Sequence, residues 1–519
     1  MNGRNLGVLL LAIAAGSLGA QIGMAAAIDL TPAEARGRII YRSGTRPTGE
    51  KIEALVGGGG TPMDGSLARC GSCHGSDGRG RPESSVIPTN IRWSDLARPY
   101  EVTSPTGRRH PAYTERLLIR AVTMGIDSAD NRLDVTMPRF ALTQGDAADL
   151  VAYLKRIADD HDPGVTDTSL RLGVLLPSEG RFPGLGTATR QVLTAYFAEI
   201  NRRGGVYGRS IELAFRELPA TDQAQSALAE FVRRDTPFTL LSSFVAGVEK
   251  QVAQIIESEK LPLIGARTML PQELTGSSLT VFSLDSGIAG QAEALAKFAI
   301  GKYPQRHAAM VSDSTDLAKV PAGALRAKLA GTPWSEIASF DAPASSPAAE
   351  ALVRRLIAAK VSCAFLFLQQ QELSSLLNAA TRLGWKPALF LPGSLALPRG
   401  NELRDFPGSV YLALPFLASD TSADAQAEYR ALSAEHHLTA EHLSTQYASL
   451  AEAKILMEAL KHAGRDLTRD RLAEAMEGLY DFAPGFVRPV SFGPARHTGI
   501  TAFHIVTVDR ATGALVKSD

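Results

Sequence analysis

The chain has 519 residues, and its 45% of hydrophobic residues are enough for folded cores rather than a disordered polymer. This length exceeds one ordinary core and predicts about three compact units. The 54 basic residues balance 54 acidic ones, and no long run of one charge occurs. The sequence therefore gives no reason to expect nucleic acid or an anionic membrane surface as a partner.

Residues 1–27 are typical of a secretory signal peptide. Arg4 is followed by an apolar stretch over residues 6–15 and then by small residues that end at Ala27. We expect the mature chain to begin near Ile28. The apolar stretch is shorter than the ~20 residues that span a bilayer, and no later run reaches that length. The protein is therefore expected not to span a membrane after cleavage; the alternative is an uncleaved anchor.

A helix is predicted to begin directly after the signal peptide. Thr31 is an N-cap residue, Pro32 occupies the first helical position, and Glu34 completes a capping box. The helix should run through Tyr41.

The segment Cys70-Gly71-Ser72-Cys73-His74 is the attachment signature of a c-type haem. On a helical turn both thiols lie on one side, where they can form thioethers with the vinyl groups, and His74 points at the iron. Half a zinc site and a redox CxxC are the alternatives. Only Cys363 remains to complete a zinc site, and the motif follows the glycine run 57–60 rather than a strand. We predict one covalent haem c and, with the signal peptide, a periplasmic location.

A second helix is predicted to begin after Thr143. The two helices resemble the first and last helices of the monohaem cytochrome c family, which cross with a glycine of one against an aromatic residue of the other. Gly37 and Tyr41 on the first helix, with Leu150 and Tyr153 on the last, match this pattern. The resemblance implies an all-α cytochrome c domain, which we place at residues 28–160.

An electron-transfer haem usually needs a sixth ligand, and a thioether raises its potential. Met137, in a Met-Pro pair ahead of the last helix, resembles the ligand loop of this family; Met124 is the alternative. The resemblance further implies that the carbonyl of Pro88 accepts the second N–H of His74. Trp93 is expected to pack on the haem, although an ordinary surface-loop tryptophan is the alternative. The chain departs from the family in the long stretch between Tyr41 and Cys70.

Residues 161–169 are predicted to form a linker, because proline, glycine and acidic residues interrupt the helical pattern. From Leu170 onward, strand and helix patterns alternate, which predicts parallel α/β sheets. The first lobe should hold strands at 170–176, 210–217 and 239–241 and helices at 187–203 and 224–234. Similar units over residues 291–391 predict a second lobe, and two such lobes make a cleft between them.

Residues 170–519 resemble the type I periplasmic solute-binding proteins, the branched-chain amino acid receptor family. The matching segments are residues 172–177, 197–209, 261–265 and 384–387 and a late helix over residues 447–463. The resemblance implies a two-lobed α/β fold, a small-molecule ligand and a possible ABC permease as a partner.

In that family the ligand is held by hydroxyls and backbone N–H groups of the first lobe, several at helix N-termini. The loops after the third and fourth strands here contain Ser242, Ser243, Phe244, Ala266, Arg267 and Thr268. Arg267 could bind a carboxylate through two hydrogen bonds, although a solvated loop arginine is the alternative.

The second lobe departs from the amino acid receptors. The acid that pairs with a substrate ammonium should fall within residues 391–395, and none is there; the cleft tyrosine is also missing from residues 312–316. We therefore expect a ligand without an ammonium group, such as a small organic acid, alcohol or aromatic compound, rather than a standard amino acid. Gln369 is a candidate polar contact.

Our leading hypothesis is a periplasmic electron carrier that passes single electrons to or from a dehydrogenase or another cytochrome. Its binding lobes would recognise a metabolite or dock the redox partner. The alternative is a solute receptor of an ABC-type importer with an accessory, redox-sensing haem domain. Haem enzyme activity ranks last, because two axial ligands leave no open iron position, and we assign no catalytic residue.

Overall fold

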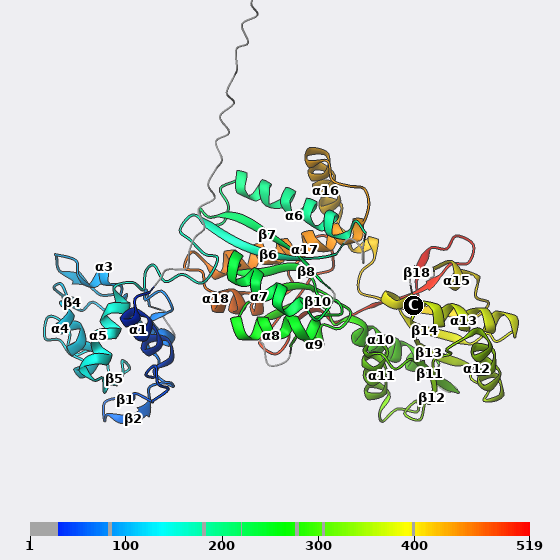
Figure 1. Cartoon of the computed structure of the whole chain (residues 1–519), viewed down its shortest axis with the longest axis horizontal. Helices are drawn as coiled ribbons and strands as arrows, with labels where there is room; N and C mark the ends of the chain where they lie inside the picture. Colours follow the sequence, from blue (N-terminus) through cyan, green and yellow to red (C-terminus); the bar gives the residue numbers. More distant parts are fainter. Residues whose placement is uncertain are drawn as a thin grey trace, which may run out of the picture.

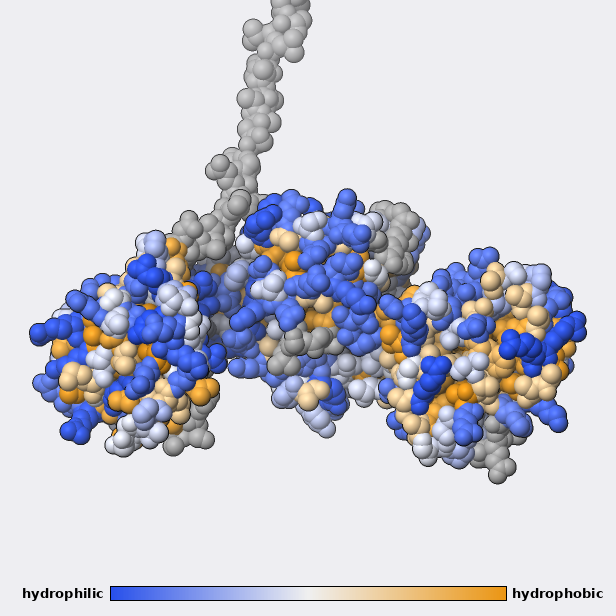
Figure 2. Space-filling view, turned by 60° about the horizontal axis from the view of Figure 1, so that its bottom comes forward, coloured by the Kyte–Doolittle hydropathy of each residue, from blue (hydrophilic) through white to orange (hydrophobic). Residues whose placement is uncertain are grey.

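The protein is described by a computed structural model that covers residues 30–80, 86–178, 183–219, 221–275, 280–303, 307–396 and 400–518. The predicted signal peptide, residues 1–27, lies outside the described residues. Among the described helices, none is both long enough and apolar enough to cross a membrane. The molecule is a row of three bodies, an N-terminal domain and two α/β lobes, joined by narrow waists (Figures 1 and 2).

The N-terminal domain is built mainly from helices. They are α1 (Pro32–Ser43), α2 (Cys70–His74), α3 (Trp93–Leu96), α4 (Glu115–Met124) and α5 (Gln144–Leu154). The predicted capping box at the start of α1 is confirmed: Thr31 Oγ accepts from the Glu34 N–H at 3.3 Å, and the Glu34 carboxylate accepts from the Thr31 N–H at 2.7 Å. The helix predicted after Thr143 is also confirmed, and it carries its own capping box with Asp146.

Helices α1 and α5 cross in close contact. Gly37 lies against α5 so closely that a Cβ there would come 2.0 Å from the carbonyl oxygen of Asp149. Next to this crossing, the rings of Tyr41 and Tyr153 are 5.5 Å apart, and both side chains are fully buried. The predicted glycine–aromatic crossing is confirmed, and it forms the centre of this domain's core.

The long stretch between Tyr41 and Cys70 forms a small sheet that the expectation of an all-α domain did not include. Strands β1 (Glu53–Val56) and β2 (Thr61–Asp64) make an antiparallel hairpin, and β5 (Arg139–Phe140) pairs with the other edge of β1. A further hairpin joins β3 (Val102–Thr103) to β4 (Arg109–His110). Because β5 directly follows Met137, the sheet fixes the end of the loop that carries this methionine.

The first lobe is a parallel sheet with helices on both faces (Figure 1). Within the described residues its strands have the order β16 (Thr498–Ile500), β10 (Val281–Asp285), β9 (Leu263–Arg267), β8 (Thr239–Phe244), β6 (Ser169–Pro177) and β7 (Ser210–Leu218). The helices are α6 (Leu185–Arg202), α7 (Ala224–Asp235), α8 (Glu249–Glu259), α9 (Gln272–Thr275), α16 (Ala423–His436), α17 (Leu443–Ala463) and α18 (Arg469–Glu477). The expected strand and helix order of this lobe is confirmed.

The second lobe is a mixed sheet rather than a purely parallel one. Strands β12 (Ala338–Asp341), β11 (Ala308–Ser312), β13 (Cys363–Phe367), β14 (Ala388–Pro392) and β15 (Ser409–Leu414) are parallel, whereas β17 (His504–Val508) and β18 (Leu515–Lys517) add antiparallel edges. The helices are α10 (Gly287–Lys302), α11 (Asp316–Leu329), α12 (Ser346–Ala358), α13 (Gln370–Arg382), α14 (Gly393–Ala396) and α15 (Gly400–Asp405), with a 3₁₀ turn, η2 (Ala418–Asp420), at the edge of the lobe. Cys363 is a buried core thiol of β13.

The N-terminal domain is attached to the first lobe by specific contacts. Arg79 of the N-terminal domain forms an ion pair with Asp466 at 3.2 Å. In the connecting segment, the Asp162 carboxylate accepts from the backbone N–H of Arg469 at 2.7 Å, at the start of α18. The Arg469 guanidinium in turn donates to carbonyls just ahead of β8 and β9. The attachment is therefore made at the amino ends of the first-lobe strands.

Candidate functional site

The five residues of the CxxCH motif form α2, which brings both thiols and His74 onto one short helix. His74 is 7% exposed, and its Nδ1 donates to the carbonyl of Thr89 at 2.9 Å. This bond places the ring hydrogen on Nδ1, so the lone pair of Nε2 is free. Burial lowers the pKa of His74, and the Thr89 bond opposes that shift only in part, so the imidazole is neutral and able to bind a metal.

The carbonyl that orients His74 is that of Thr89, not that of Pro88, so this prediction was wrong by one residue. The Pro88 carbonyl instead lies against Gly80, where a Cβ would be 2.3 Å from its oxygen. Successive peptide carbonyls point in different directions, so the sequence could locate the loop but not the oxygen that faces the ring.

His74 and Met137 line one cavity of the N-terminal domain, together with Cys70. The rest of its lining is largely apolar and comes from α4, α5 and the segment around Ile91. These residues fit a c-type haem: a thiol for attachment, an imidazole and a thioether for the iron, and an apolar enclosure for the ring. The second thiol, Cys73, is on the exposed side of α2.

Arg139 holds the loop that carries Met137. Its guanidinium donates to the carbonyls of Met137, Leu133 and Asp134, the last two at 3.0 and 3.2 Å. Met124, the alternative sixth ligand, is 64% exposed at the end of α4 and does not line the cavity. The geometry thus favours Met137 between the two candidates.

Trp93 does not line this cavity, contrary to our expectation. Its ring lies under the ammonium of Lys155 at 5.2 Å, a cation–π contact at the edge of the domain. Ile91 and Leu96, its neighbours in sequence, line the cavity instead. Trp93 is not a surface-loop residue either, because it begins α3 and packs, half-buried, against the core of the domain.

The sequence analysis missed Arg108, the cationic side chain among the cavity-lining residues. It forms an ion pair with Asp127, which is fully buried and also accepts from the side chain of Asn131 at 3.0 Å. The ion pair with Asp127 fixes this guanidinium at the wall of the cavity. No motif marks Arg108, since its role comes from the fold of the 104–131 segment.

In the first lobe, the hydroxyls expected to bind solute are already engaged. Ser242 and Ser243 are fully buried. Ser242 Oγ donates to the carboxylate of Glu452, and Ser243 Oγ accepts from the Leu175 N–H at 3.0 Å while donating to the carbonyl of Leu241 at 3.1 Å. These two serines stabilise the sheet and its contact with α17.

Arg267 is paired within the protein. Its guanidinium forms an ion pair with Glu452 at 2.9 Å and donates to Ser449 Oγ at 2.9 Å, both on α17. Glu452 is 3% exposed, and burial raises its pKa. The carboxylate that we expected from a solute is thus supplied by the chain itself. Glu452 could have been found from the sequence, as a charged residue on the apolar face of the late helix.

The cavity between the lobes has a volume of ≈370 Å³ and lies beside the predicted residues rather than among them. None of Ser242, Ser243, Phe244, Ala266, Arg267, Thr268 and Gln369 lines it. Phe244 stacks under the Arg267 guanidinium at 5.4 Å, and Thr268 donates to Glu249. Gln369 caps α13 and is exposed.

The lining of this cleft cavity comes from the start of α8, the loop after β9 and the start of α11. Lys250 lies between the two lobes, 3.5 Å from Glu273 of the first and 3.9 Å from Asp316 of the second. These ion pairs link the two lobes at the cleft. The described residues that line the cavity do not include the acid and tyrosine with which the amino acid receptors bind an α-amino acid.

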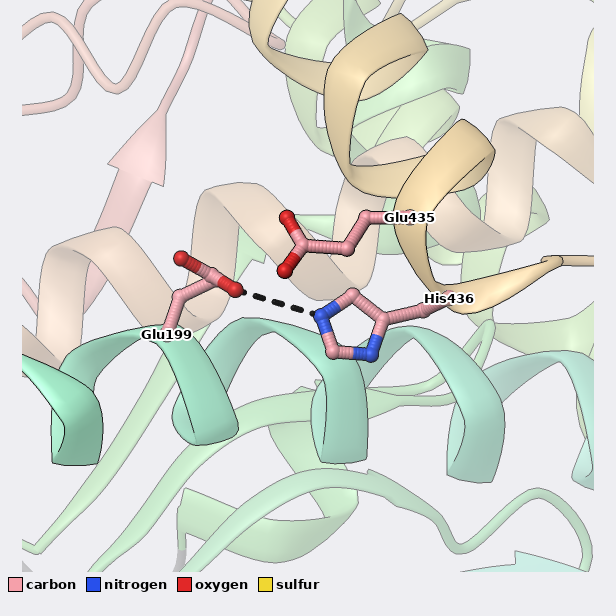
Figure 3. Close-up of side chains that lie close together, drawn as sticks. All are labelled: Glu199, Glu435 and His436. Carbon is pink, nitrogen blue, oxygen red and sulfur yellow. Dashed lines mark hydrogen bonds and ion pairs between the residues drawn. The ribbon is translucent and has the colours of Figure 1, made fainter.

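A further cluster joins α6 and α16, where Glu199, Glu435 and His436 bring ligand atoms close together (Figure 3). Glu199 accepts from His436 Nε2 at 3.2 Å, and Arg202 pairs with both carboxylates. A guanidinium already neutralises these acids, so the cluster is a surface ion-pair network that ties the two helices.

Two family models match the chain, one over the two α/β lobes and one over the N-terminal domain. A model for the periplasmic binding protein family matches residues 169–514. The chain belongs to the periplasmic binding protein family. A second model, for cytochrome c, matches residues 66–158, so a cytochrome c domain precedes the binding-protein region. Both parts of the predicted fold class, a cytochrome c domain and a two-lobed type I fold, are confirmed.

Solved structures share the binding-protein fold. A fatty acid ABC transporter substrate-binding protein from Thermomonospora curvata is 20% identical, with a TM-score of 0.54 over 69% of this chain and 93% of its own. A branched-chain amino acid ABC transporter protein from Thermus thermophilus with bound valine is 16% identical, with a TM-score of 0.52 over 68% of this chain and 96% of its own. At these identities the likeness shows the fold alone. No curated protein matches the sequence.

Proposed function

We propose that this protein is a periplasmic c-type cytochrome that transfers single electrons and whose binding-protein lobes recognise a small metabolite or dock a redox partner. The observation that carries the proposal is the shared cavity of His74, Met137 and Cys70, enclosed by apolar side chains. A haem held there supplies a one-electron iron couple. We propose one haem c, attached through Cys70 and Cys73.

The chain's own residues support electron transfer rather than catalysis. The Thr89 carbonyl fixes the ring of His74, and Arg139 fixes the Met137 loop, so these two residues would be held ready to bind the iron of a haem in this cavity. Two fixed ligands leave no position for a substrate. Carbon monoxide binding to the reduced protein would contradict this and favour a haem enzyme.

The proposed organisation is a signal peptide at residues 1–27, a cytochrome domain at 28–160, a linker at 161–169 and the binding-protein domain from residue 170. Export of the chain agrees with its membership of a periplasmic family. The electron partner would be a dehydrogenase or another cytochrome of the same compartment.

The proposed cleft ligand is a small molecule other than a standard amino acid. Two features support this. Arg267 is neutralised by Glu452, so it does not offer a charge to a solute carboxylate. Residues 391–395 contain no acid for a solute ammonium.

The second candidate is a receptor of an ABC-type importer with an accessory haem domain. It is favoured by the fold shared with substrate-binding proteins of such transporters. In this case the haem would sense the redox state rather than carry electrons to a partner.

A redox titration of the purified holoprotein, followed by visible absorption with and without small organic acids, alcohols and amino acids, tests the proposal. A midpoint potential that shifts with ligand would show that the cleft and haem are linked. An unchanged potential despite demonstrated binding would place the importer receptor first. A protein that takes up no haem would exclude both.

A further inference from the structure

A second, larger cavity at the lobe junction shares no lining residue with the cleft cavity, although the segment over residues 269–273 borders both. Its volume is ≈1140 Å³. Two of the chain crossings between the lobes, at residues 285–287 and 500–504, border it, and one wall is the face of α10 that includes Gly290, Glu293 and Lys297. We call it the hinge cavity. Ligand sites of this size commonly lie at domain junctions.

The floor of the hinge cavity holds a buried polar atom without a partner. Ser283, on β10, is 4% exposed, and its Oγ has no hydrogen-bond partner among the described residues. Its backbone N–H is already used, since it donates to the carbonyl of His497 at 2.9 Å. A buried hydroxyl left without a hydrogen bond is unfavourable. A molecule bound in the cavity would satisfy it.

The walls of the hinge cavity supply positive charge from both lobes. Lys297 of α10 and Lys328 near the end of α11 come from the second lobe, and Arg496 comes from the turn before β16 in the first. None of these three forms an ion pair with a described residue, and all three are exposed. The acid in the lining is Glu293. The excess of unpaired cations favours an anion.

The other titratable groups of the lining are engaged. The Lys302 ammonium lies 5.2 Å from the Phe298 ring and 3.4 Å from Ser518 Oγ. His497 Nε2 lies 3.0 Å from Glu477, away from the cavity. Phe298 and Phe503 give the cavity an apolar wall beside the cations. The lining therefore combines charge, a free hydroxyl and aromatic surface.

We propose that the hinge cavity binds an organic anion with an apolar body. Its carboxylate would lie between Lys297 and Arg496, with Ser283 Oγ as a hydrogen-bond donor and the body against Phe503. Such a ligand contacts both lobes and thereby favours one relative position of the lobes over others. The site shares no lining residue with the cleft cavity or with the proposed haem site.

Benzoate is the probe for this site, titrated calorimetrically into the full-length holoprotein at low ionic strength. We expect saturable binding that weakens by about tenfold or more in the double variant Lys297→Ala with Arg496→Ala. The matched control, Lys319→Ala with Arg430→Ala, removes one exposed cation from each lobe outside the cavity and should bind benzoate as the parent does. Benzyl alcohol, which lacks the charge, should bind at least about tenfold more weakly than benzoate.

Two single variants sharpen the assignment. Ser283→Ala should weaken benzoate binding several-fold without lowering the melting temperature, because the hydroxyl has no partner in the protein to lose. Lys250→Ala, in the cleft, should leave benzoate binding unchanged. The proposal is overturned if benzoate binding does not saturate, or if both double variants weaken benzoate binding equally. It is also overturned if Lys250→Ala alone weakens benzoate binding. The last result would still leave the proposed electron transfer intact.

Discussion

Met137 and His74 approach the same cavity from segments far apart in the sequence, and each is held by a backbone-directed contact. Thr89 fixes the histidine ring, and Arg139 gathers the carbonyls of the methionine loop. The positions of both side chains therefore depend on one backbone carbonyl and one guanidinium that lie outside the proposed iron contacts.

Met137→Ala should remove the thioether ligand and lower the midpoint potential by about 0.1 V or more, within the ≈0.8 V range that axial ligands span. Potentiometry of the purified holoprotein measures the shift, and the reduced variant should also bind carbon monoxide. Met124→Ala is the control, because that side chain is 64% exposed and outside the cavity. Equal potentials for the two variants would contradict the assignment of Met137.

The proposed haem attachment can be read from the sequence because covalent attachment requires a fixed local spacing, which Cys70, Cys73 and His74 satisfy. Thr89 could not be assigned in the same way, because its role depends on the direction of one carbonyl. Glu452 stands out in the sequence as a charge on the apolar face of a helix, but its pairing with Arg267 depends on how that helix is rotated against the sheet. The structure does not bring the solute residues predicted by family position to the lining of the cleft cavity, and Arg267 pairs with Glu452 of the chain itself.

Asp285 gives the first lobe a pH-dependent stability. It lies half-buried at the end of β10, near Glu452, and desolvation raises its pKa from 3.8 to about 6, opposed by the Gly287 N–H. The folded state therefore binds this proton more tightly than the unfolded state. The stabilisation is complete below about pH 4 and is lost as the pH rises through about 6.

Asp285→Asn keeps an acceptor for the Gly287 N–H and removes the ionisation. Its free energy of unfolding should exceed that of the parent at pH 7.5 by up to about 3 kcal/mol, with a smaller difference at pH 4.5. Urea unfolding at both pH values measures this. Asp316→Asn, at an exposed cleft position, is the control. The assignment would be refuted if the difference in unfolding free energy between the parent and Asp285→Asn did not change with pH.

At the scale of elements, the cytochrome domain depends on the crossing of α1 and α5. Gly37 lets the two backbones approach, and the buried tyrosine pair fills the space beside it. Tyr41 also donates to the Gly75 carbonyl at 2.6 Å, directly after the CxxCH helix. The crossing thus supports the haem-binding segment as well as the core.

Gly37→Ala should destabilise this domain by about 1–3 kcal/mol, because the added Cβ meets backbone atoms of α5 that have little freedom to move. Thermal unfolding followed by haem absorption measures the loss. Gly145→Ala is a matched control on α5, where the nearest atom to a Cβ is 3.9 Å away. That variant should be neutral or slightly stabilising, and a similar loss in both would argue against the crossing.

The helices and strands of the core could be predicted because each carries its own signal, such as the capping boxes before α1 and α5 or the apolar run of β6. The sheet of β1, β2 and β5 has no such signal. Its strands are short, and β5 pairs with β1 across more than eighty residues, so the pairing follows from packing rather than from local pattern. The antiparallel edge of the second lobe was missed for the same reason.

At the scale of the molecule, the predicted linker is held in place rather than free. Asp160 binds Arg42 at 3.0 Å and Tyr153 at 2.7 Å on the cytochrome side, and Asp162 caps the start of α18 on the other. The segment thus fixes the haem domain to the first lobe.

Asp162→Ala should release this attachment and speed cleavage of the 161–169 segment by proteinase K about five- to tenfold, as expected for the loss of a hydrogen bond at a helix N-terminus. Gel analysis of timed digests of the holoprotein measures the rate. Asp159→Ala is the control, because Asp159 pairs with Arg156 inside the cytochrome domain. Equal cleavage rates would show that the segment is held by other contacts.

The cytochrome domain sits at the amino ends of the first-lobe strands, whereas the cleft cavity lies at their carboxyl ends. One sheet therefore separates two faces that never compete for the same space. If the proposed partners exist, a partner of the cytochrome domain and a ligand of the cleft would contact different ends of the first lobe. Electron transfer at one end of the lobe and ligand binding at the other would therefore not exclude each other sterically.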